Sequence, residues 1–181
     1  MSKNLKPPVD GKDNIQGGMN GVLELVEYGD YQCPHCGRAY PIIKRIQQTL
    51  GKKLRFAFRN FPLAEIHPDA MNAAVAAEAA ALQDKFWQMH DMIYENQQQL
   101  DIEALFFYAK AIGLDLETFK RDIQKDELVS KVEADFESGV RSGVNGTPTF
   151  FIQGEKYEGN WEYELIPFLE NKAQQLQMES K

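Results

Sequence analysis

The stretch LVEYGDYQCPHC, residues 25–36, decides how this 181-residue chain folds. It continues an apolar run, 22–28, that is rich in strand-forming residues. Between residues 40 and 50, apolar side chains recur at helical spacing. Pro34 then falls at the first helical position, where its missing N–H would have no partner in any case. The pattern predicts a strand that leads directly into a helix, with Cys33 as the N-cap residue of that helix.

Cys33 and Cys36 are the two cysteines of the chain. One helical turn apart on the same face, they can form a small-ring disulfide or remain a dithiol. A helix start has unpaired N–H groups and partial positive charge, so we expect the pKa of Cys33 to lie below that of an ordinary thiol. We therefore predict Cys33 as the exposed attacking sulfur and Cys36 as the resolving one. His35, when cationic, would favour the thiolate further and make the disulfide more oxidising.

Three other interpretations compete with redox activity for this pair. A structural disulfide across two residues closes a small loop and removes little entropy from the unfolded chain. A structural zinc site needs four ligands, usually from two paired motifs, whereas this chain has one such motif and the histidines His35, His67 and His90. Two inert buried thiols are the third, although a helix start is a poor place to bury them. We favour redox activity, with no metal and no organic cofactor.

Two features elsewhere in the chain join the cysteine pair. Glu27 lies six residues before Cys33, and Gly146-Thr147-Pro148 precedes a strand-like run, 149–152. Together with Cys33-Pro34-His35-Cys36, these features resemble the thioredoxin superfamily, and most closely the bacterial DsbA-like thiol:disulfide oxidoreductases. The resemblance covers about residues 20–180 in the order of elements, with three short segments that match tightly. It implies an α/β thioredoxin fold, a central mixed sheet flanked by helices, with an inserted helical subdomain.

The resemblance also implies roles for residues outside the pair. Glu27 resembles a buried carboxylate beneath the disulfide, which could relay a proton to or from Cys36; Glu24 is a rival for that position. Pro148 resembles a cis-proline that faces the cysteines, and a cis bond would leave the backbone of Thr147 free to pair with an extended substrate. We predict four catalytic residues, two substrate-binding residues and one structural residue at the site: Cys33, Cys36, His35 and Glu27; Thr147 and Pro148; and Pro34.

The remaining histidines are not assigned to the site. His67 precedes Pro68, which biases it toward extended backbone and marks a helix entrance. His90 lies in an apolar helical pattern and is expected to be a packed residue.

The domain organisation follows from the order of the patterns. Residues 1–20 are polar and are expected to form a flexible N-terminal segment. A thioredoxin-like domain is expected from residues 21–62 and 144–181, with residues 63–143 as the inserted helical subdomain. Within these segments the sequence predicts a strand at 54–59, helix caps at Asp101 and Asp115, a hairpin across Gly154 and a last helix at 161–177 with a possible kink at Pro167.

Composition limits the classes of partner. The chain is 43% hydrophobic, which is ample for a core, and its net charge of −7 argues against a nucleic-acid surface. It contains no apolar run of about 20 residues that could span a bilayer. Residues 1–20 lack the apolar segment of an export signal, which favours the cytoplasm. A chain from which such a signal had been removed would look the same, and would then be periplasmic or extracytoplasmic. We expect a monomer.

The resemblance implies a thiol:disulfide oxidoreductase that exchanges disulfides with protein cysteines and is more oxidase-like than reductase-like. A separate redox partner would have to regenerate the cysteine pair. Alternatives are a disulfide reductase or isomerase, and a glutathione-linked small-molecule enzyme on the same fold. A non-redox peptide-binding module is a further alternative.

Overall fold

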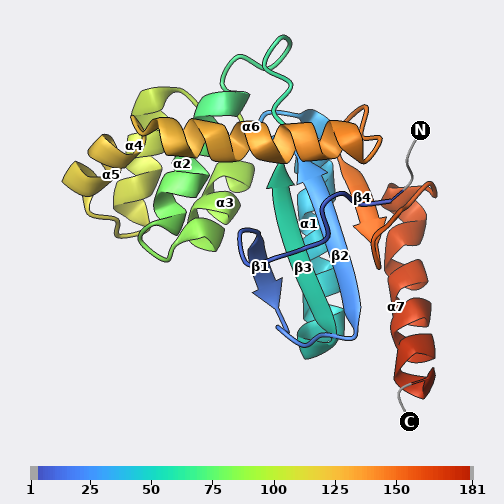
Figure 1. Cartoon of the computed structure of the whole chain (residues 1–181). Coiled ribbons are helices and arrows are strands. Elements are labelled where there is room, and N and C mark those ends of the chain that lie inside the picture. Colours follow the sequence, from blue (N-terminus) through green and yellow to red (C-terminus); the bar gives the residue numbers. More distant parts are fainter. Residues whose placement is uncertain (1–3, 180–181) are drawn as a thin grey trace. The chain divides into compact units, whose positions relative to one another are not determined.

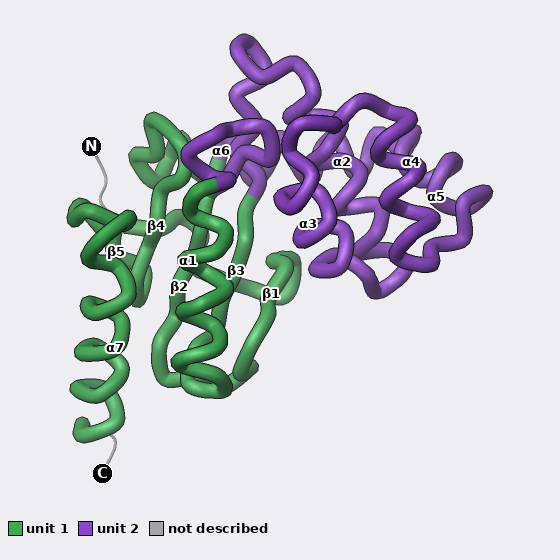
Figure 2. Tube along the Cα trace, turned by 180° about the vertical axis from the view of Figure 1, so that it is seen from behind, with its two compact units in different colours: residues 1–28, 38–59, 138–181 green, residues 29–37, 60–137 purple. Residues whose placement is uncertain are grey.

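The computed structural model describes residues 4–179 and divides into two compact units, each of which draws on separate segments of the chain (Figure 2). Unit 1 comprises residues 1–28, 38–59 and 138–181, and unit 2 comprises residues 29–37 and 60–137. The segment that carries the cysteine pair therefore groups with the helical part of the chain.

A five-stranded mixed sheet organises unit 1, with strand order β1-β3-β2-β4-β5. Its strands are β1 (Asn14–Gly17), β2 (Leu23–Gly29), β3 (Leu54–Asn60), β4 (Thr149–Ile152) and β5 (Glu155–Lys156). β1 is antiparallel to β3, and β4 is antiparallel to both β2 and β5, whereas β2 and β3 run in the same direction (Figure 1). The central strands β2 and β3 are buried along nearly their whole length, as their continuous apolar sequences favour. The predicted hairpin across Gly154 is present between β4 and β5.

Two long helices contribute to unit 1. α1 (Pro34–Leu50) covers one face of the sheet, as both views show, and α7 (Trp161–Glu179) runs beside the β4–β5 hairpin (Figures 1 and 2). Pro41 in α1 and Pro167 in α7 each remove one intrahelical hydrogen bond, yet both helices continue through them. The buried apolar residues recur at helical spacing: Ala39, Ile43, Ile46 and Leu50 in α1, and Leu165, Leu169 and Ala173 in α7.

The described part of the predicted flexible segment is paired with the rest of unit 1. β1 forms a ladder with β3, and the buried Arg59 of β3 makes an ion pair with Asp13, with Nε–Oδ1 at 2.7 Å and Nη2–Oδ2 at 2.9 Å. The Arg59 guanidinium also donates to the carbonyl oxygens of Pro7 and Pro8. A polar composition does not reveal such partners; a flexible segment at residues 1–20 stays a prediction. Residues 1–3 of that prediction lie outside the described residues.

Unit 2 contains the helical part of the chain. Its helices are α2 (Ala70–Ala81), α3 (Phe86–Glu95), α4 (Ile102–Ala111), α5 (Leu116–Asp122) and the first three turns of α6 (Asp126–Arg141). The predicted caps are confirmed, because the side chain of Asp101 accepts from the Ala104 N–H and that of Asp115 from the Thr118 N–H. α2 is buried on almost every side, since its alanines let neighbouring helices approach closely.

Candidate redox site

The cysteine pair stands at the start of α1, in unit 2. Pro34 is the first residue of the helix, and the carbonyl of Cys33 accepts the first intrahelical hydrogen bond, from the Gly37 N–H at 3.0 Å. Cys33 is thus the N-cap residue, as predicted. Its own N–H donates to the carbonyl of Asp30 at 3.1 Å, which closes a turn before the helix. The two cysteines form a dithiol in this structure.

Both sulfurs lie in buried residues. Cys33 is 3% exposed and Cys36 is 0% exposed, so Cys33 is the more accessible of the two by a small margin. The prediction that Cys33 is exposed is therefore wrong, because Cys33 is buried. Pro34 and His35, between the cysteines, are exposed. The turn before Cys33, residues 30–33, is hydrogen-bonded to the helical part of unit 2.

Residue 31 of this turn is anchored by aromatic packing. The Tyr31 hydroxyl hydrogen-bonds to Nδ1 of His90 at 2.9 Å. The Tyr31 ring lies 4.9 Å from the ring of Tyr94, centroid to centroid, and Phe86 and Trp87 also pack on His90. His90 is therefore a packed residue of α3, as expected, and one that orients the turn before Cys33.

Two glutamine side chains fix the remaining backbone of the turn. The Gln32 amide accepts from the Asp69 N–H at 2.7 Å and donates to the Asp69 carboxylate at 3.2 Å. Gln97, just beyond α3, donates through Nε2 to the carbonyl oxygens of Tyr31 and Cys33, each at 2.8 Å. Sequence reasoning missed Gln97, because its partners lie 66 and 64 residues away.

Asp30 is the most heavily bonded residue of the turn, and its side chain is 0% exposed. Its carboxylate accepts from the N–H of Gln32 and the N–H of Leu63, both at 2.8 Å, and from Nδ1 of His67 at 2.7 Å. Its backbone N–H lies 3.4 Å from Sγ of Cys36. His67, predicted only as a helix-boundary residue, thus pairs with the carboxylate of a residue whose backbone N–H contacts Cys36.

The buried carboxylate predicted in β2 is Glu27, in unit 1. Glu27 is 3% exposed and lies opposite Phe150 of β4 in the strand register. The rival, Glu24, has a side chain that is 22% exposed and forms an ion pair with Arg55 at 3.1 Å. Partial burial raises the pKa of Glu24, and the charge of Arg55 opposes that rise. Of the two carboxylates, Glu27 is the buried one.

The predicted cis peptide bond is present between Thr147 and Pro148, directly before β4 in unit 1. The next residue, Thr149, pairs with Tyr28 of β2, and its hydroxyl donates to the carbonyl of Gly146 at 2.7 Å.

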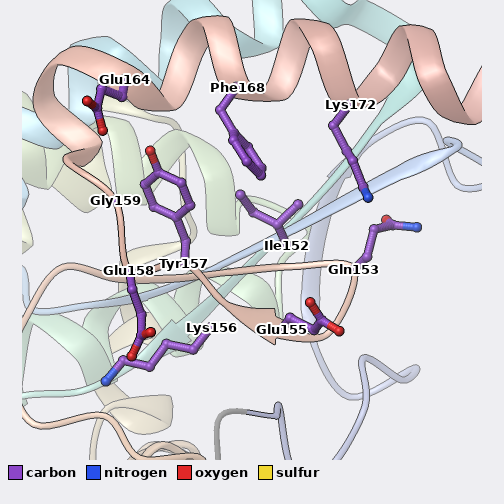
Figure 3. Close-up of a pocket in the computed structure, with 10 residues that line it drawn as sticks. All are labelled: Ile152, Gln153, Glu155, Lys156, Tyr157, Glu158, Gly159, Glu164, Phe168 and Lys172. Atoms are coloured by element: carbon purple, nitrogen blue, oxygen red, sulfur yellow. The ribbon is translucent and has the colours of Figure 1, made fainter.

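A surface hollow lies between the β4–β5 hairpin and α7 in unit 1, and the side chains of Tyr157 and Phe168, which pack on each other, are among those that line it (Figure 3). Lys156 and Lys172 also line it. None of the predicted site residues lines this hollow. Among residues 4–179, no cluster of three or more His, Cys, Asp or Glu side chains is arranged to hold a metal ion.

The family model described as Thioredoxin matches residues 10–167. The chain belongs to the thioredoxin family. A thioredoxin-like oxidoreductase from Silicibacter pomeroyi DSS-3 superposes with a TM-score of 0.81 at 25% identity, over 92% of this chain and 94% of that one. BdbD from Bacillus subtilis superposes with a TM-score of 0.83 at 22% identity, over 97% and 98%. Wolbachia pipientis alpha-DsbA1 gives 0.82 at 19% identity, over the whole of both chains.

These matches confirm the predicted thioredoxin fold. Family membership joins a cysteine pair at the start of α1, and the predicted membership of the thioredoxin superfamily is confirmed.

Curated relatives match this thioredoxin-family chain over a smaller part of their own length. The Na(+)/H(+) antiporter NhaA 1 of Mycolicibacterium vanbaalenii is 38% identical over 162 residues, which are 88% of this chain and 26% of that protein. The antiporter NhaA of Herminiimonas arsenicoxydans is 38% identical over 90% of this chain and 26% of its own length. The chain thus spans about a quarter of these relatives. None of the helices described here is long and apolar enough to cross a membrane.

Proposed function

We propose that this chain is a thiol:disulfide oxidoreductase that exchanges disulfides with protein cysteines, and that it favours oxidation over reduction. The observation that carries the proposal is the position of the Cys33-Pro34-His35-Cys36 pair, with Cys33 as the N-cap residue of α1. The partial positive charge of a helix start stabilises a thiolate there. Because this stabilises the reduced form, the disulfide becomes the stronger oxidant.

The oxidising reaction takes place in two exchanges. A substrate thiolate attacks Sγ of Cys33, the Cys33–Cys36 bond breaks, and its electron pair goes to Sγ of Cys36. A second substrate thiolate then attacks the substrate sulfur of this mixed disulfide and releases Cys33 as a thiolate. Two electrons pass from the substrate thiols to the enzyme, so a redox partner must accept them from the dithiol before the next cycle. The same steps in reverse reduce a substrate disulfide.

The other predicted residues have supporting roles in this proposal. The buried Glu27 relays a proton to or from Cys36, and His35 favours the thiolate of Cys33. Thr147 and Pro148 bind the extended substrate chain through the backbone of Thr147. The net charge of −7 supports a protein substrate rather than a nucleic acid.

The decisive experiment is an insulin-reduction assay with and without glutathione, combined with the reduction potential of the pair measured against glutathione. A thiol:disulfide oxidoreductase exchanges with protein substrate directly and loses turnover in Cys33→Ser, whereas Cys36→Ser accumulates a mixed disulfide. A potential near the thioredoxin value of about −270 mV contradicts the oxidising version, and a value toward about −120 mV supports it.

Two other outcomes of this assay identify the competing functions. Exchange that requires glutathione and proceeds only with small disulfides indicates a glutathione-linked enzyme. Full peptide binding by Cys33→Ser, with no disulfide exchange by the parent, indicates a non-redox binding module.

A further inference from the structure

We propose that Asp30 is a positioning residue for Cys36. Its backbone N–H stabilises negative charge on Sγ of Cys36, and the buried pair that Asp30 forms with His67 holds the N–H in that direction. The inference rests on the proposed disulfide exchange. It adds to that exchange a hydrogen-bond donor for the resolving sulfur of Cys36, which is not the N-cap residue of α1.

The contact itself is a backbone N–H directed at a buried sulfur. The Asp30 nitrogen lies 3.4 Å from Cys36 Sγ, and Cys36 is 0% exposed. A thiolate formed at such a position is cut off from bulk water, so its charge depends on hydrogen-bond donors of the protein. Donors to an ionised acceptor form the stronger class of hydrogen bond.

The direction of this N–H is set by hydrogen bonds on every polar group of Asp30. Its carbonyl accepts from the Cys33 N–H, and one carboxylate oxygen accepts from the Gln32 N–H. The other carboxylate oxygen accepts from the Leu63 N–H and from Nδ1 of His67. Residue 30 cannot rotate about its backbone without breaking several of these bonds. All partners belong to unit 2.

An aspartate is the side chain that this arrangement requires. Three donors converge on the two oxygens of Asp30, and a carboxylate has only acceptors. In Asp30→Asn, the amide NH₂ must face at least one of those donors, and the turn has to shift to relieve the conflict. The N–H of residue 30 then moves relative to Cys36, although the substitution keeps that N–H.

The contact acts in both directions of the exchange. When a thiolate attacks Cys33, the Cys33–Cys36 bond breaks and the electron pair moves to Sγ of Cys36, where the N–H stabilises the leaving thiolate. A leaving thiol with a lower pKa departs faster. In the reverse direction the same N–H maintains the Cys36 thiolate that attacks a mixed disulfide on Cys33. The helix start stabilises the negative charge of a Cys33 thiolate, and the Asp30 N–H stabilises that of a Cys36 thiolate.

The test compares Asp30→Asn with a matched control, Asp135→Asn. Asp135 is also a buried carboxylate of unit 2, and it accepts from the Asn60 N–H at 3.1 Å and from Lys131 at 2.6 Å. Each protein is reduced and reacted with a thionitrobenzoate disulfide to form a mixed disulfide on Cys33. Attack by Cys36 then releases the coloured thiol, whose absorbance gives the rate. The pKa of Cys36 is measured separately from ultraviolet thiolate absorbance in a Cys33→Ser background.

We expect Asp30→Asn to raise the pKa of Cys36, because loss of the oriented N–H outweighs loss of a nearby negative charge, which alone would lower that pKa. Asp135→Asn should leave the pKa of Cys36 unchanged. A tenfold loss of Cys36 thiolate, offset in part by the greater nucleophilicity of a more basic sulfur, slows release about threefold. His67→Ala is a second, milder variant that removes one donor to the Asp30 carboxylate and keeps the carboxylate itself. We expect it to raise the pKa of Cys36 by less than Asp30→Asn does. A merely structural Asp30 would lower the melting temperature without moving the pKa of Cys36.

The inference is overturned if folded Asp30→Asn and His67→Ala both release the thiol at the parent rate or faster, with a Cys36 pKa that is unchanged or lowered. Failure of the proposed function gives a different result, in which the parent does not exchange with protein substrate at all. The Cys36 titration in the Cys33→Ser background tests the Asp30 contact in either case.

Discussion

Nε2 of Gln97 lies 2.8 Å from the carbonyl oxygen of Cys33 and donates a hydrogen bond to it. The same amide occupies the space beside Gly37, where an added Cβ would collide with Oε1 of Gln97. A single side chain beyond α3 thus explains both a fixed N-cap carbonyl and a glycine in the first turn of α1.

Gly37→Ala and Gln97→Ala should therefore be coupled. Gln97→Ala removes two hydrogen bonds to backbone carbonyls and is expected to lower the free energy of unfolding by about 1–3 kcal/mol. Gly37→Ala in the parent displaces Gln97 and destabilises. In the Gln97→Ala background it should instead stabilise by about 0.5–1 kcal/mol, because alanine is the better helix former. Urea unfolding of the four proteins measures both effects, and an equal effect of Gly37→Ala in the two backgrounds would contradict the coupling.

Glu27→Gln should slow disulfide exchange and leave the fold intact. A buried carboxylate that relays a proton contributes to the rate, so we expect a loss of roughly tenfold or more in the turnover of insulin reduction. Glu24→Gln is the matched control, because Glu24 lies on the same strand but pairs with Arg55. An exchange rate in Glu27→Gln equal to that of the parent would remove this residue from the site.

The pKa of Cys33 should lie below the ordinary thiol value of about 8.5. Alkylation of reduced Cys36→Ser at graded pH isolates this sulfur and measures its pKa. His35→Ala in the same background should raise the pKa of Cys33 and, in the full pair, make the disulfide less oxidising. If Cys33 titrates at or above an ordinary thiol, neither the helix start nor His35 activates it.

Asp13→Ala should destabilise unit 1 strongly. It leaves the guanidinium of Arg59 buried without its carboxylate, and removal of one partner of a buried pair costs about 3–5 kcal/mol. The N-terminal segment should also become sensitive to limited proteolysis. Asp10→Ala, at an exposed carboxylate in the same segment, is the control and should change the unfolding free energy little. Similar unfolding midpoints for the two variants would show that the Arg59 pair does not hold this segment.

Because of Glu24, the free energy of unfolding should fall as the pH rises above the ordinary pKa of a glutamate. Burial raises the pKa of Glu24 above 4.5, so the folded state keeps a proton that the unfolded chain has already lost. Between 4.5 and the raised pKa the folded state binds more protons, and the free energy of unfolding therefore falls with rising pH. Glu24→Gln should flatten this slope in urea unfolding at graded pH, while Glu155→Gln, at an exposed position of β5, should not.

Features that depend on neighbouring residues were predicted well from the sequence. The N-cap position of Cys33, the caps at Asp101 and Asp115 and the hairpin across Gly154 all follow from interactions within a few residues. Such signals are local, because a cap bonds to a group in the first turn and a tight turn needs its own backbone angles.

The surroundings of the cysteine pair depend on residues far along the chain. Asp30 pairs with His67 across 37 residues, Gln97 bonds to Cys33 across 64, and Arg59 bonds to Asp13 across 46. No spacing rule connects residues at such separations, since packing of the helices and strands brings them together. Hence the amino-acid pattern was sufficient to place two sulfurs at a helix start, but the burial of Cys33 and the contact of Asp30 with Cys36 became visible only in three dimensions.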